Sequence, residues 1–145
     1  AKTTIAAIAR EAGVSSETIY SVFANKRTLI QKLIVGAARR DAPDTMLVEQ
    51  TGPKAIFAAT DPSDQIRRFA HDVTDVLSNV APLMAVVRTG AASEPELAAL
   101  YSQLQAGRRQ NLAVFVSALA RNGGIREGLD LDVATATVWR LASPE

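Results

Sequence analysis

The sequence predicts an all-α fold, and three observations support this prediction. Apolar residues recur at intervals of three and four along most of the chain, helix-capping side chains precede these runs, and no stretch shows the alternation of a β-strand. With 145 residues, 48% of them hydrophobic, the chain can bury one sizeable core, or a small domain joined to a larger one. The absence of cysteine excludes disulfides and thiolate metal sites and favours a reducing compartment.

The first forty residues predict two short helices that meet over a tight turn. Gly13 follows an apolar periodic run and can adopt the left-handed conformation that ends a helix. Either Ser15 or Ser16 can then cap the second helix. Helices that cross so closely need a small residue before the turn and an aliphatic residue after it, and Ala9 and Ile19 meet these two demands. This is the layout of a DNA-binding helix-turn-helix.

A third helix is predicted directly after the second. Asn25 is a candidate cap, Phe23 can fill the space between the helices, and apolar residues follow at helical spacing at Leu29, Ile30, Leu33 and Ile34. The whole run resembles the DNA-binding domain of the tetracycline-repressor (TetR) family of bacterial transcription regulators. The motifs that carry the resemblance are Ile8-Ala9, Gly13-Val14-Ser15, and the series Tyr20, Phe23, Lys26 and Leu29.

The resemblance implies a division of the chain into two domains. Residues 1–40 would form the helix-turn-helix domain, and residues 41–145 a helical-bundle domain for ligand binding and dimerisation. The family also implies a further helix before the motif and more helices at the C-terminus, so we expect both to be missing from this chain. The charge distribution agrees with this division: residues 1–40 hold seven basic and two acidic groups, and the remainder holds nine basic and thirteen acidic groups. A phosphate backbone would attract the first part.

The second helix, about 16–23, would enter the major groove with its N-terminal residues towards the bases. The candidate groove contacts are Ser15, Ser16, Glu17, Thr18 and Ser21, and none is an Arg, Asn or Gln able to make a bidentate base contact. Glu17 would either accept from cytosine or act as a first-turn acid. The resemblance implies phosphate contacts for Thr4, Tyr20 and Lys26. A half-buried ring for Tyr20 and a solvated position for Lys26 are the alternatives.

The remaining elements are predicted to be helical. Residues 41–61 form a connector with a short helix around Lys54 to Ala59. A helix begins at Asp61-Pro62-Ser63-Asp64, with an inward stripe of Ile66, Phe69, Ala70, Val73, Val76 and Leu77, and we expect Pro82 to interrupt it before a shorter helix over 83–92. Ser93 and Glu96 have capping-box spacing and would open a long helix that Gly123-Gly124 ends. The last helix begins near Asp130 or Asp132.

The resemblance also implies a homodimer whose C-terminal helices bind a small molecule. Candidate ligand contacts are Phe69, Met84, Arg88, Tyr101, Phe115 and Trp139. A core role is the alternative for Phe69, Met84 and Phe115, and Trp139 would line the pocket, fill the core or anchor the dimer. Arg88 lies in an apolar stretch, where an arginine usually needs an acidic partner or an anionic ligand. His71, the only histidine, is expected to be solvated.

The resemblance therefore implies a ligand-responsive regulator, a repressor that a small molecule releases from double-stranded operator DNA. The alternative is a helical protein-interaction module that does not bind DNA. An enzyme is not expected, because the chain shows no nucleophile-base set, phosphate loop or metal cluster, and no cofactor is predicted. No apolar run of membrane-spanning length and no signal peptide is found, so we expect a cytoplasmic protein without a membrane partner.

Overall fold

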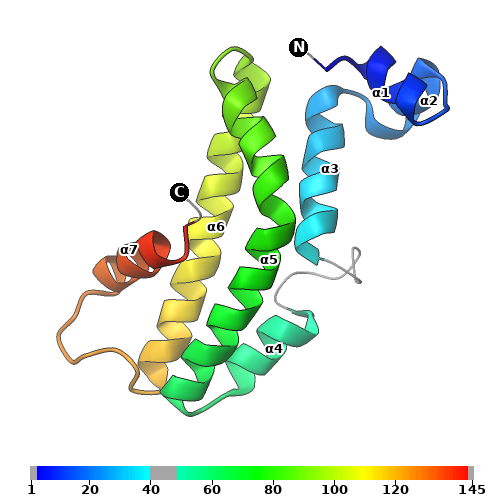
Figure 1. The fold of residues 1–145 in the computed structure, drawn as a ribbon. Helices are drawn as coiled ribbons and strands as arrows, with labels where there is room; N and C mark the ends of the chain where they lie inside the picture. Colours follow the sequence, from blue (N-terminus) through cyan, green and yellow to red (C-terminus); the bar gives the residue numbers. More distant parts are fainter. Residues whose placement is uncertain (1–2, 40–48, 144–145) are drawn as a thin grey trace.

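The computed structural model describes residues 3–39 and 49–143, and these two ranges contain seven helices and no strand (Figure 1). The long helices α5 and α6 lie side by side as an antiparallel pair, with α3 along one side of the pair and α7 on the other. The helices are α1 (Ile5–Glu11), α2 (Ser16–Phe23), α3 (Lys26–Arg39), α4 (Thr51–Ala58), α5 (Pro62–Ala91), α6 (Pro95–Arg121) and α7 (Leu131–Leu141). The predicted all-α class is confirmed for the described residues.

The turn between α1 and α2 forms as the sequence predicts. Gly13 has a φ of +68°, and the Oγ of Ser15 rather than that of Ser16 caps α2 by accepting from the Thr18 amide at 3.0 Å. Ala9 and Ile19 are both buried where the two helices cross. They belong to the N-terminal cluster, whose buried residues are Ile5, Ala9, Ile19 and Leu29.

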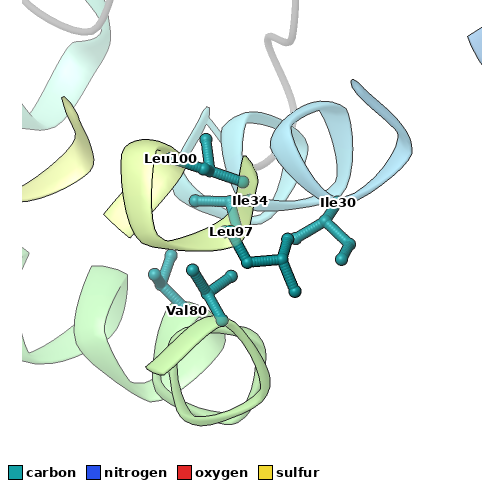
Figure 2. Packing of buried hydrophobic residues seen from close by; sticks show 6 residues of the cluster. Ile30, Ile34, Val80, Leu97 and Leu100 are labelled. Atoms are coloured by element: carbon teal, nitrogen blue, oxygen red, sulfur yellow. The ribbon is translucent and has the colours of Figure 1, made fainter. Parts of the chain in front are cut away.

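Helix α3 contributes to two cores. Its start is capped by Asn25, whose Oδ1 accepts from the Thr28 amide at 2.8 Å. Leu29 packs into the N-terminal cluster, whereas Ile30 and Ile34 pack against α5 and α6. Figure 2 shows both isoleucines beside residues of α5 and α6 in the central cluster, which consists of Ile30, Ile34, Val80, Val87, Leu97 and Leu100. A displacement of α5 or α6 therefore reaches α3 by direct contact.

A third cluster lies at the opposite end of the α5–α6 pair. It joins Ile56 of α4, Phe115, Val116 and Leu119 of α6, and Ala134 of α7. The rings of Phe69 and Phe115 stack with centroids 3.9 Å apart.

The predicted inward stripe of the helix after Asp61 is wrong in part. Ile66 is 46% exposed and Ala70 is exposed, whereas Gln65 is fully buried. Gln65 Nε2 donates to the Ile56 carbonyl at 3.2 Å, and its Oε1 accepts from Asn122 Nδ2 at 3.1 Å. The Gln65 side chain can be buried because its amide nitrogen and its amide oxygen both have hydrogen-bond partners. With Gln65 facing the core, the next residue of the helix, Ile66, faces water.

The predicted interruption at Pro82 is also wrong, because α5 continues through it from Pro62 to Ala91. A proline inside a helix costs about 3 kcal/mol, since it removes one hydrogen bond and crowds the preceding turn. Here the ring lies on an exposed face, and the buried Val80 and Val87 anchor the turns on either side of it. Tertiary packing of both turns outweighs the local penalty.

The predicted capping box over 93–96 does not form. The N-cap of α6 is Glu94, which makes no side-chain capping bond, and the Ser93 hydroxyl donates to the Gly90 carbonyl at 3.5 Å. Pro95 occupies the first helical position, which fixes the start of α6 one residue later than a Ser93 cap requires. The Glu94 side chain is instead held by Lys26 of α3.

The predicted start of the short helix after the connector is wrong by three residues, whereas the predicted start of the last helix is confirmed. Helix α4 begins at Thr51, before the predicted Lys54. Pro53 is compatible with this earlier start, because amides in the first turn of a helix have no partner within the helix and a proline there costs no hydrogen bond. Asp130 caps α7, and its Oδ1 accepts from the Asp132 amide at 2.6 Å. The connector residues 41–48 lie outside the described residues.

Candidate nucleic-acid interface and cavity

Nearly all side chains of α2 are at least partly exposed to solvent. The helix lies at one edge of the molecule (Figure 1). Within α2, all of which is described, Ile19 is the one buried residue. Glu17, Thr18 and Ser21 are exposed, Ser16 is half-buried, and Tyr20 is 53% exposed. An exposed short helix held by a single buried side chain has the shape that fits a DNA groove.

Several hydroxyl groups predicted to contact DNA also fix the local structure. Thr4 Oγ1 accepts from the Ala7 amide at 3.2 Å and so caps α1. The Ser15 Oγ and Thr18 Oγ1 lie 3.0 Å apart, and Ser21 Oγ donates to the Thr18 carbonyl at 2.9 Å. Because these groups are already oriented by hydrogen bonds, a DNA contact by any of them would need little further ordering.

Basic side chains near the start of α3 are held by acceptors within the chain. Lys26 Nζ lies 3.1 Å from Glu94 Oε1 and 3.3 Å from Oε2, and both side chains are about one-third exposed. Arg27 Nη2 donates to Gln103 Oε1 at 2.9 Å. These two contacts join the start of α3 to the first half of α6, so the predicted phosphate contact Lys26 has an internal carboxylate partner in this structure.

A cavity of about 630 Å³ lies among α3, α5 and α6. Four of the six predicted ligand residues line it: Phe69, Met84, Arg88 and Tyr101. Phe115 lines a smaller hollow of about 80 Å³ between α4, α5 and α6, where Phe69 also contributes. Trp139 lines neither of these two spaces, and its ring lies 4.7 Å from the guanidinium carbon of Arg108.

Sequence reasoning missed several polar residues that line the cavity. They are Arg39, Asp72, Gln103, Gln105, Arg108 and Asn111. Arg108 also donates to the Ala142 carbonyl and, at 3.4 Å, to Ser143 Oγ, so it connects the cavity to the end of α7. Arg108 lies four residues before Leu112, and Asn111 lies four residues before Phe115. A polar residue one helical turn from an apolar residue of α6 is therefore the sequence signal that could have identified both.

His71 is exposed, with Nδ1 3.4 Å from Asp75 Oδ2, and it does not line the cavity. Within 3–39 and 49–143, no group of three His, Asp or Glu side chains is arranged to hold a metal ion. None of the helices in these ranges has the length and apolar character needed to cross a bilayer.

Comparison with known proteins matches the N-terminal region alone. A family model described as bacterial regulatory proteins, tetR family, matches residues 1–33. No curated protein and no solved structure matches the chain. The matched residues cover α1, α2 and the first half of α3.

Proposed function

We propose that this chain is a DNA-binding transcription regulator in which a small molecule bound among α3, α5 and α6 controls the affinity for operator DNA. The match of residues 1–33 to the model of bacterial regulatory proteins, tetR family, supports the DNA-binding part of this proposal. The protein acts as a repressor, and ligand binding releases it from the operator. It works in the cytoplasm as a homodimer, with residues 1–40 binding DNA and residues 41–145 binding the second copy and most of the ligand. Helix α3 of the first part completes the ligand site with Ile34, Val35, Ala38 and Arg39.

The position of α3 is the observation that carries this proposal. Leu29 supports the helix-turn-helix, Ile30 belongs to the central cluster, and Ile34 belongs to that cluster and also lines the cavity. A ligand that moves α5 or α6 therefore shifts α3, and with it the adjoining α2. Two recognition helices of a dimer must sit about 34–36 Å apart to enter successive major grooves, so a small rotation of each is enough to weaken binding.

On the DNA side, Thr18 and its neighbours at the start of α2 contact base edges, and Thr4, Tyr20 and Lys26 contact phosphates. The exposure of the α2 side chains supports this assignment. Their short hydroxyls give limited hydrogen-bond discrimination between bases, so DNA shape contributes to specificity.

Fluorescence anisotropy with labelled duplex DNA over a range of salt concentrations tests the DNA side of the proposal. For Lys26→Ala we expect weaker binding of all sequences and a salt slope smaller by about 1, because one phosphate contact is lost. Lys54→Ala is the matched control, since Lys54 is an exposed lysine of α4, far along the chain from the motif. An unchanged slope for Lys26→Ala would contradict the phosphate contact.

Selection from a random duplex library tests base contact. Thr18→Ala should change the selected sequences, because the variant loses a methyl and a hydroxyl at the groove. A complete lack of salt-dependent DNA binding by the unaltered chain would instead favour the helical protein-interaction module. That second candidate has the amphipathic helices it needs, but the basic first forty residues favour DNA.

A further inference from the structure

The cavity among α3, α5 and α6 has an elongated apolar body. On α5 its lining residues extend from Phe69 to Arg88, and between Asp72 and Arg88 they are Val73, Val76, Leu77, Val80, Ala81, Met84 and Ala85. At 1.5 Å per residue the apolar stretch from Val73 to Ala85 is about 18 Å long. Leu104 and Leu112 of α6 face the same space. A volume of about 630 Å³ over such a length suits a long, narrow ligand better than a compact one.

The charged residues of the cavity are predominantly basic. Among the described residues that line it there are three arginines, Arg39, Arg88 and Arg108, and one acid, Asp72. An anionic group is therefore favoured within the cavity and a cationic group is disfavoured.

The two ends of the cavity differ in charge. Asp72 and Asn111 lie towards the end that adjoins the aromatic hollow of Phe69 and Phe115. Arg88 lies near the other end of α5, about 24 Å away along the helix axis. Arg88 is exposed, so a charged headgroup can keep part of its hydration there while an attached chain is buried.

Tyr101 of α6 adds a second polar group to the cavity. Its hydroxyl accepts from Gln105 Nε2 at 3.0 Å, a bond that orients the phenol within the lining. Arg108 is committed to a different task, since it contacts Ala142, Ser143 and the ring of Trp139 at the end of α7. Arg88 lies at the end of the α5 lining farthest from Asp72, so an anion at Arg88 is repelled least by that carboxylate.

We propose that the cavity binds a long-chain carboxylate, with the carboxylate at Arg88 and Tyr101 and the apolar chain extended along α5 towards Val73. The inference rests on the proposed function, because it names the chemical class of the molecule that controls DNA binding. Burial of each methylene favours binding about fourfold, so affinity depends strongly on chain length.

Isothermal titration calorimetry of the full chain with palmitate tests this inference. We expect palmitate to bind, octanoate to bind at least about tenfold more weakly, and hexadecanol to bind about tenfold more weakly because it lacks the charge. Equal affinity for palmitate and hexadecanol, or for palmitate and octanoate, would overturn the assignment.

Two variants locate the ligand. Arg88→Gln should weaken palmitate binding about tenfold, and Arg67→Gln is the matched control because Arg67 is an exposed arginine of the same helix outside the cavity lining. Ala81→Trp should block the chain and abolish binding, with circular dichroism used to check that the variant remains folded. Full affinity in Arg88→Gln would overturn the placement of the carboxylate, and full affinity in Ala81→Trp would overturn the placement of the chain.

Parallel DNA-binding measurements separate this inference from the proposed function. DNA binding by a chain that does not bind palmitate would overturn the ligand class and leave the regulator intact. Palmitate binding that depends on Arg88 but does not change DNA affinity would support the ligand class and contradict the proposed switch.

Discussion

The helix-turn-helix and the helices that follow it are built from contacts of different range. The N-terminal cluster joins residues no farther apart in the chain than Ile5 and Leu29. The central cluster joins Ile30 to Leu100, and the third cluster joins Ile56 to Ala134. Local contacts of the first kind leave a recognisable sequence pattern, whereas the long-range clusters depend on how distant helices happen to pack. This difference agrees with a family match confined to residues 1–33.

The comparison also shows where the two regions are joined. Leu29 and Ile30 are adjacent residues of α3, yet they belong to different clusters. The ion pair between Lys26 and Glu94 adds a polar contact between the same two regions. The helix-turn-helix is therefore local in its own packing but rests on a helix that the rest of the molecule holds.

The largest expected effect comes from the long-range cluster. Leu100 is fully buried, and Leu100→Ala should lower the free energy of unfolding by about 2–5 kcal/mol, because the cavity left between α3, α5 and α6 cannot close completely. Urea denaturation followed by circular dichroism measures the change. Leu141→Ala, at a leucine that is 82% exposed, should change stability by less than about 0.5 kcal/mol. An equal loss of unfolding free energy in Leu100→Ala and Leu141→Ala would contradict the central role of the long-range cluster in stability.

A smaller effect is expected within the local motif. Gly13 has a φ of +68° and open space around its Cα, so Gly13→Ala costs about 1–2 kcal/mol through backbone strain alone. It should lower DNA affinity while the central cluster remains intact. Gly36 lies inside α3 and also has open space, so Gly36→Ala should stabilise the protein by about 0.5–1 kcal/mol. Thermal unfolding and DNA anisotropy of both variants would show whether the signs differ as expected.

The smallest effect concerns the polar contact between the two regions. Removing the charge of Glu94 releases Lys26 for a phosphate, so Glu94→Gln should raise DNA affinity about two- to fivefold, as expected for a partly exposed ion pair. Glu96→Gln removes the same charge from an exposed position of the first turn of α6 and serves as the control. An equal gain in both variants at low salt would indicate a general charge effect instead of competition for Lys26.

Much of the fold followed from local signals in the sequence. Gly13, Asn25 and Asp61 were predicted as turn or capping residues, and each has that role because a left-handed glycine or a side-chain acceptor acts on amides a few residues away. The predicted helix break at Pro82 and the predicted cap at Ser93 were wrong for the opposite reason. Their local preferences were overridden by the packing of α5 and by the position of Pro95.

The candidate sites were predicted unevenly. Four of the six proposed ligand residues line the cavity, because polar or aromatic side chains on apolar helices are a usable signal. Arg39 and Asp72 were missed, since they looked like ordinary charged residues in the sequence. The ion pair of Lys26 with Glu94, 68 positions apart, had no sequence signal at all.

The sequence by itself determined the class of fold, the helix-turn-helix and its capping residues, because these depend on spacing and on hydrogen bonds between near neighbours. Only the tertiary structure decided that Gln65 is buried, that α5 passes through Pro82 unbroken, and that α3 belongs to two cores. These features depend on packing between helices far apart in the chain, where the summed burial of several side chains exceeds the preference of any single residue.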